Sequence, residues 1–117
     1  SGQALSIFGN GEQTRDFIYV QQVVEYYLQA LSGNITGVYN AGNSSSYSIK
    51  RLAQKIIKII ENSDSRIEFL KSRPGDIRKS LADITRLSCN FEIQDMNFDE
   101  ALVETIEYYS TTDANKA

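Results

Sequence analysis

The fold is decided by the stretch GNGEQTRDFIYV, residues 9–20, which separates two different hydrophobic patterns. Before it, residues 4–8 form a short apolar run that is typical of a β-strand. Gly9 and Gly11 end that run because both tolerate a positive φ. After it, apolar side chains recur at helical spacing up to a stop near Gly33. These side chains belong to Val20, Val23, Val24, Tyr27, Leu28 and Leu31.

Two further strand patterns and a helix follow along the chain. Residues 37–42 predict a buried strand, because a short run of β-formers lies between glycines, and residues 43–46 predict the turn after it. Ser48 predicts the N-cap of a second helix, since its hydroxyl can accept a bond from a backbone N–H. Residues 66–70 predict another strand, which the Pro74-Gly75 turn ends.

The last third of the chain predicts two helices. Asp83 is placed to cap a short helix through Leu87, and Asn97 with Glu100 forms the pattern of a capping box before a longer helix. The inward side chains of the longer helix should be Phe98, Ala101, Leu102, Ile106 and Tyr109. The fold class is therefore α/β, or mixed α+β for the chain by itself, with three to four helices and short strands.

Composition limits the number of domains and excludes several classes of partner. With 117 residues, of which 41% are hydrophobic and 23% charged, the chain can bury one modest core. A net charge of −3 argues against a nucleic-acid surface, and no apolar run reaches the roughly 20 residues of a membrane helix. We expect a tag or linker remnant at residues 1–3, one domain over residues 4–110 and a polar tail at residues 111–117.

Cys89 is the single cysteine, and the chain has no histidine. An intrachain disulfide is therefore impossible, and the usual residues of zinc sites and of histidine catalysis are missing. We expect no metal site, a packing role for Cys89 and a cytoplasmic location. The pairs Tyr26-Tyr27 and Tyr108-Tyr109 lie on expected helices, which predicts that one ring of each pair faces the core.

Three arginines lie in or beside expected loops, where a guanidinium can point two N–H groups at a phosphate. They are Arg15, Arg73 and Arg78. The alternative is that they form ordinary salt bridges, and the spacing leaves both interpretations open. The partners in that case would be Asp16, Asp76 and Asp83.

Two polar side chains are further candidates for a binding site. Asp76 could accept bonds from the hydroxyls of a ribose or pair with Arg73. Asn40 follows an expected strand and could bind a phosphate, bind a sugar hydroxyl or close an Asx turn. Gly9-Asn10-Gly11 lacks the third glycine and the following helix of a dinucleotide fingerprint, so no cofactor-binding residue is expected in this chain.

Three segments together resemble the extended short-chain dehydrogenases/reductases, and their order is similar to that in the sugar-nucleotide epimerases of this family. They are residues 9–20, residues 38–42 (VYNAG) and residues 73–84 (RPGDIRKSLADI). The chain departs from the pattern at Gln21-Gln22, where relatives commonly carry an acidic residue, and in residues 87–94, where the usual Leu-Gly is missing. The resemblance implies the C-terminal part of a Rossmann-type enzyme, with the N-terminal NAD-binding half outside this chain.

The resemblance also implies roles for the candidate residues. Arg15 and Arg73 would bind the diphosphate of a UDP- or dTDP-sugar, Asp76 would hold the ribose, and Asn40 would lie near the nucleotide. No catalytic residue is implied in this chain, and the NAD of the full-length enzyme would bind in the other half. The helix from Val20 and the strand at residues 38–41 should lean on that half, so their apolar surface should be exposed and the chain should self-associate.

The activity implied first is that of a UDP-sugar 4-epimerase acting on UDP-N-acetylglucosamine or UDP-glucose. A dTDP-glucose 4,6-dehydratase or a related UDP-sugar decarboxylase would use the same nucleotide-binding residues. A third alternative, of another class, is a non-catalytic binding module or a homo-oligomer that uses the exposed helix face.

Overall fold

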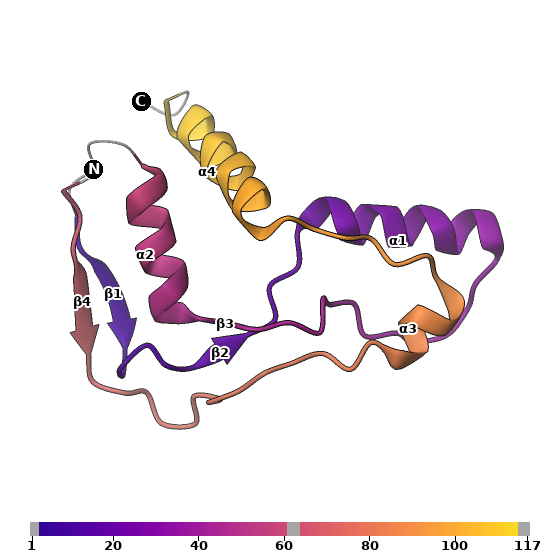
Figure 1. Ribbon diagram of the computed structural model, residues 1–117, viewed down its shortest axis with the longest axis horizontal. Coiled ribbons are helices and arrows are strands. Elements are labelled where there is room, and N and C mark those ends of the chain that lie inside the picture. Colours follow the sequence, from indigo (N-terminus) through magenta and orange to yellow (C-terminus); the bar gives the residue numbers. More distant parts are fainter. Residues whose placement is uncertain (1–2, 61–63, 115–117) are drawn as a thin grey trace.

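The computed structural model describes residues 3–60 and 64–114 of the chain. Figure 1 shows β1, β4 and α2 gathered at one end of the molecule, α1 and α3 at the other end, and long loops running between the two ends. The elements are β1 (Leu5–Phe8), β2 (Thr14–Arg15), α1 (Val20–Gly33), β3 (Tyr47–Ser48), α2 (Ile49–Ile59), β4 (Ile67–Leu70), α3 (Thr85–Asn90) and α4 (Phe98–Ala114).

Two short sheets organise the first of these ends. β1 and β4 are parallel, with Leu5 opposite Ile67 and Phe8 opposite Leu70. β2 and β3 are antiparallel and contribute two residues each. Since parallel strands need a crossover connection, α1 and α2 both lie in the chain between β1 and β4. The strands expected at residues 4–8 and 66–70 are confirmed.

The helix starts follow the expected capping chemistry. Ser48 Oγ accepts a hydrogen bond from the Arg51 backbone N–H at 3.1 Å, which caps α2. Asn97 Oδ1 accepts one from Glu100 N–H at 3.1 Å and caps α4. Both caps were expected from the sequence and are confirmed.

The ends of α1 and α3 differ slightly from the expectation. α1 ends at Gly33 as expected, but the left-handed residue that closes it is Asn34, with φ 51°. Asp83 Oδ1 accepts bonds from the N–H and the hydroxyl of Thr85, and the helix it precedes continues to Asn90 and not only to Leu87. Backbone bonds from Phe91 to Leu87 extend that last turn.

Residues 37–42 do not form the expected strand. In the part of the chain that the structure describes, no other strand pairs with them, and Val38 is 82% exposed. A strand needs a neighbour for its N–H and C=O groups, so β-forming residues alone do not produce one. The expectation of a buried strand is therefore wrong for this chain.

Residues 111–114 of the expected polar tail continue α4. The hydroxyls of Thr111 and Thr112 donate to the carbonyls of Glu107 and Tyr108, four residues earlier. Their hydrogen-bonding capacity is thus used within the helix. Residues 115–117 of that tail, like residues 1–2 of the expected N-terminal remnant, lie outside the described residues.

Three expectations about individual side chains have mixed outcomes. Tyr26 is 6% exposed and Tyr27 68% exposed, which confirms that one ring of this pair faces the core. Tyr108 and Tyr109 are both exposed, because α4 is covered on one side only, by α2. Cys89 is exposed, so the expected packing role is wrong.

Much of the apolar surface of this chain is open. The radius of gyration is 16.9 Å, against about 13 Å for a compact domain of this length. The solvent-accessible area is 8518 Å², against about 6,400 Å² for a folded monomer of this mass. The apolar side chains along α1 are exposed, as expected, except that Val23 is half-buried. We call the exposed ones the α1 face. They are Val20, Val24, Tyr27, Leu28 and Leu31.

We predict that the chain self-associates through the α1 face, because a contiguous apolar patch of this kind is unfavourable in water. Replacing Leu28 and Leu31 with Glu should yield a monomer in sedimentation velocity at sub-millimolar protein. The control is Leu81→Glu, which adds charge at an exposed leucine outside α1. A wild-type chain that sediments as one monomeric species and melts cooperatively would contradict the prediction.

Candidate functional site

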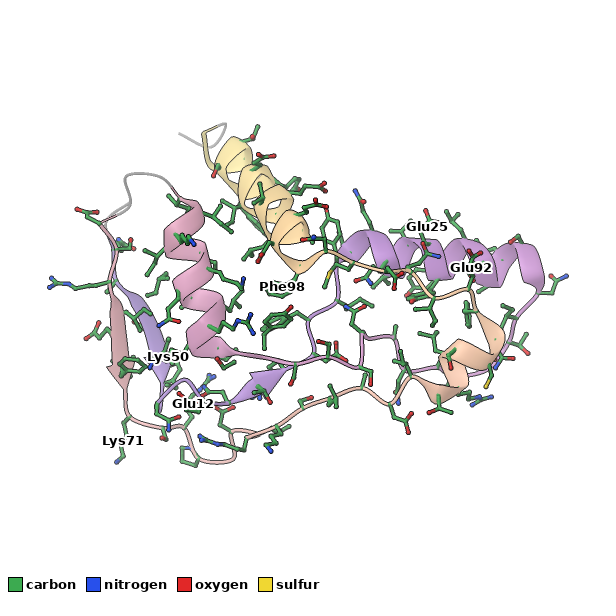
Figure 2. The ribbon with its side chains drawn as sticks, in the orientation of Figure 1. Glu12, Glu25, Lys50, Lys71, Glu92 and Phe98 are labelled. Carbon is green, nitrogen blue, oxygen red and sulfur yellow. The ribbon has the colours of Figure 1, made fainter. Side chains whose placement is uncertain are left out.

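A cavity of about 670 Å³ opens where the C-terminal ends of β1 and β4 meet the start of α2. Figure 2 shows Lys50 and Glu12 at this end of the molecule, with Lys71 just beyond β4. We call this cavity of about 670 Å³ the strand-end cavity. Its lining combines two phenyl rings, polar loop atoms and several charged side chains: Phe8, Gly9, Asn10, Glu12, Gln13, Lys50, Phe69, Ser72, Arg73, Asp76, Ile77 and Arg78.

The glycine turn after β1 shapes one wall of the cavity. Gly11 has φ 77°, and a Cβ placed there would lie 2.8 Å from Lys50 Cβ, so a side chain is excluded by backbone conformation and by space. Asn10 Oδ1 accepts bonds from Glu12 N–H at 3.0 Å and from Arg78 Nη1 at 3.1 Å. The turn thus connects the loop after β1 to the loop after β4.

Arg15 and Asp76 form the ion pair of the site. Arg15 Nη2 lies 2.9 Å from Asp76 Oδ1, although the two residues are 61 positions apart. Both side chains are about a quarter exposed, at 27% and 25%. The sequence left open whether Arg15 pairs with Asp16 and Asp76 with Arg73, and the fold pairs Arg15 with Asp76.

Arg73 lies over the aromatic face of Phe8, with its guanidinium carbon 4.2 Å from the ring centroid. A guanidinium in this position gains a cation–π contact and keeps its N–H groups available at the ring edge. The strand-end cavity therefore brings Arg73 and Asp76 together, and Arg15 adjoins them through its ion pair.

Asn40 is not among the lining residues of this cavity. It is exposed in the irregular segment before Gly42, where Arg86 of α3 donates to the Val38 carbonyl at 3.0 Å. That segment belongs to the α1 and α3 end of the molecule (Figure 1). Its contact with a nucleotide stays a prediction.

Sequence reasoning missed the role of Asp16. Its carboxylate accepts backbone N–H bonds from Asn43 at 2.9 Å, Ser44 at 2.8 Å and Ala82 at 3.3 Å. Gly42 fits beside it because a Cβ there would lie 2.5 Å from Ala82 Cβ and 2.8 Å from Asp16 Oδ2. Asp16 thus joins three loops, and an aspartate next to a site arginine was its only signal in the sequence.

Lys50 was missed as well, since a lysine on an expected helix is usually a solvated surface residue. It lies at the second position of α2 and lines the same cavity as Arg73. The cations in and beside the cavity are Arg15, Lys50, Arg73 and Arg78, and the carboxylates are Glu12 and Asp76. The site is locally positive in a chain of net charge −3, which suits an anionic ligand.

Residues 3–60 and 64–114 contain neither a metal-binding cluster nor a membrane-spanning helix. No group of three or more His, Cys, Asp or Glu side chains there could hold a metal ion. Within the same residues, every helix is too short or too polar to cross a bilayer. The cationic cavity is thus the feature that carries a functional interpretation.

Comparison with known proteins gives the class of the fold and then the family. The model of the NAD dependent epimerase/dehydratase family matches residues 1–42. The UDP-N-acetylglucosamine 4-epimerase from Methanobrevibacter ruminantium M1, solved with UDP-N-acetylmuramic acid, superposes with a TM-score of 0.82 and 34% identity, over 93% of this chain and 35% of that one. The fold is that of Rossmann-type extended short-chain dehydrogenases/reductases.

Two more relatives narrow this class. A UDP-glucuronic acid 4-epimerase variant from Bacillus cereus, solved with a fluorinated UDP-glucuronic acid and NAD, has a TM-score of 0.81 and 30% identity over 93% of this chain and 36% of its own. UDP-glucuronic acid decarboxylase 1 of Danio rerio is 33% identical over 93% of this chain and 26% of its own length. In sequence and fold the chain matches part of the enzymes of the NAD-dependent epimerase/dehydratase family. It spans about a quarter of the length of the curated relatives it matches first.

We predict that Asp16→Ala lowers the free energy of unfolding by about 2–4 kcal/mol, because three backbone N–H groups lose a charged acceptor. Urea denaturation followed by circular dichroism measures this change. Asp95→Ala removes an exposed carboxylate outside the three-loop junction and should change stability by less than about 0.5 kcal/mol. Equal stability of Asp16→Ala and the wild type would show that the junction does not hold the loops.

Proposed function

We propose that this chain binds the nucleotide diphosphate of a UDP-sugar as part of an NAD-dependent UDP-sugar 4-epimerase. The observation that supports this most is the strand-end cavity, where Arg73 and the Arg15–Asp76 ion pair meet in a locally positive site. Arg15 and Arg73 are proposed to bind the diphosphate, and Asp76 to accept hydrogen bonds from the ribose hydroxyls.

The ion pair matches the chemistry of such a ligand. A nucleoside diphosphate presents anionic oxygens next to two neutral hydroxyls, and the pair offers a bidentate donor next to an acceptor, 2.9 Å apart. On binding, Arg15 would exchange part of its bond to Asp76 for a bond to phosphate. Both side chains are partly exposed, so this exchange needs no opening of a buried core. Asn40 is proposed to contact the nucleotide only once the α1 end is covered.

Catalysis is proposed to need residues beyond these 117. NAD supplies a hydride acceptor to enzymes of this kind, and the Gly9-Asn10-Gly11 turn does not fit NAD, since β2 and not a helix follows it. The described residues of this chain would bind and orient the substrate, which lowers the entropic cost of the reaction. We assign no catalytic residue to them.

The α1 face is proposed to be the contact surface for the NAD-binding half. The NAD-binding half could bury the five exposed apolar residues of this face. It could also supply a strand that pairs with the β-forming segment around Val38, which has no partner strand in the described residues. A free, exposed Cys89 suits a reducing compartment, so we propose a cytoplasmic location. Self-association through the same face would give a homo-oligomer only when that half is missing.

The relatives favour a uridine nucleotide over dTDP, because the three named above all carry UDP-sugar names. Two of them are 4-epimerases, which is why epimerisation is proposed first. The 33% identity to a UDP-glucuronic acid decarboxylase makes decarboxylation the second candidate. Both activities would use the same diphosphate site and would differ in residues around the sugar.

We predict that UDP shifts the amide NMR signals of Arg15, Arg73 and Asp76 when titrated into the chain. Arg73→Gln and Asp76→Asn should each weaken UDP binding about tenfold or more, since each loses a charge-assisted hydrogen bond. Arg66→Gln, which removes an exposed arginine outside the cavity, should leave the Kd unchanged. Signals that stay still at millimolar UDP would refute independent binding and with it the non-catalytic binding module.

A further inference from the structure

The strand-end cavity holds a cation that the family resemblance does not assign. Lys50 lines the cavity from the first turn of α2, and its backbone N–H donates to the Gly11 carbonyl at 3.0 Å. Its Cβ lies against Gly11, which has no side chain to push it away. The backbone and Cβ of Lys50 are therefore held against the glycine turn after β1, at the end of the molecule where Figure 2 labels Lys50.

The other cations of the site already have partners within the described residues. Arg15 is paired with Asp76 at 2.9 Å, Arg73 lies on the Phe8 ring at 4.2 Å, and Arg78 donates to Asn10 Oδ1 at 3.1 Å. Engaging Arg15 or Arg78 costs an existing hydrogen bond, whereas Arg73 keeps its N–H groups available beside the Phe8 ring. The ammonium of Lys50 has no hydrogen bond, ion pair or ring contact among residues 3–60 and 64–114.

An unpaired ammonium on a residue that lines a cavity gains more from an incoming anion than a hydrogen-bonded guanidinium does, because no internal bond is broken. Glu12 lines the same cavity and forms no ion pair with Lys50 in the described part of the chain. A lysine is also a compact charge on a flexible stem, with three donors that can follow a phosphate oxygen. These features point to an anionic group and not to an uncharged base or sugar.

We propose that Lys50 is a further binding residue for the diphosphate of the nucleotide, and that this ligand engages its ammonium without breaking an internal contact. This inference rests on the proposed function, since it takes the nucleotide diphosphate as the ligand. It adds a third cation from α2 to the two arginines from the loops after β1 and β4.

The test compares the affinities of the 117-residue chain for UDP and for uridine by NMR titration at fixed ionic strength. Lys50→Gln and Lys50→Met remove the charge, and Lys50→Met keeps the length of the stem. Lys50→Arg keeps the charge. Lys58→Gln is the matched control, because it removes a lysine from the last turn of the same helix, outside the cavity. The amide spectrum of each variant without ligand reports whether it folds.

Both charge-removing variants should raise the Kd for UDP about tenfold and flatten its dependence on salt, while the Kd for uridine stays within twofold. Lys50→Arg and Lys58→Gln should stay within twofold of the wild type for UDP. The proposal is overturned if the charge-removing variants bind UDP like the wild type, if uridine weakens equally, or if Lys58→Gln has the same effect. UDP binding by the wild type with no Lys50 effect refutes this inference alone, whereas a wild type that fails to bind UDP refutes nucleotide binding by the chain alone, and this inference with it.

Discussion

The Asp16 carboxylate is the constraint on which the rest of the site depends. The described residues of the chain bury few side chains and form two sheets of two strands, so the long loops cannot be held by a large core. Asp16 holds them instead, by accepting N–H bonds from Asn43, Ser44 and Ala82. Because it follows Arg15 directly, the same junction fixes the backbone from which the guanidinium reaches Asp76. Close packing at this junction leaves no room for a side chain at Gly42.

Polar side chains take over the role of a core at the other end of the molecule as well. Gln22 is 4% exposed and donates to Asn43 Oδ1 and to the Gln94 carbonyl. A carboxylate at this position could not make these donations, because it has no N–H group. Tyr19 donates to Glu104 across the start of α4, and this hydrogen bond raises the pKa of the Tyr19 phenol, because a donor must keep its proton.

The sequence was sufficient wherever local chemistry decides the structure. Neighbouring residues predict the two strands β1 and β4, which form the parallel pair. They also predict the helix caps at Ser48 and Asn97 and the glycine turn after β1. It was insufficient where a partner distant in the sequence decides. Residues 37–42 are β-forming but have no neighbouring strand in the described part of the chain. Arg15 forms its ion pair with Asp76, which is distant in the sequence, and not with the adjacent Asp16. Lys50 could not be recognised from the sequence as a residue of the cavity, because only the fold brings it next to Gly11.

The central claim is that the strand-end cavity binds a nucleotide diphosphate through Arg15, Arg73 and Asp76. A crystal structure of the chain with UDP tests it most directly, since it shows the position of each phosphate. We expect diphosphate oxygens within hydrogen-bond distance of both guanidinium groups and the ribose hydroxyls on the Asp76 carboxylate. UDP bound elsewhere on the chain, with the Arg15–Asp76 pair and the Arg73–Phe8 contact unchanged, would contradict the claim.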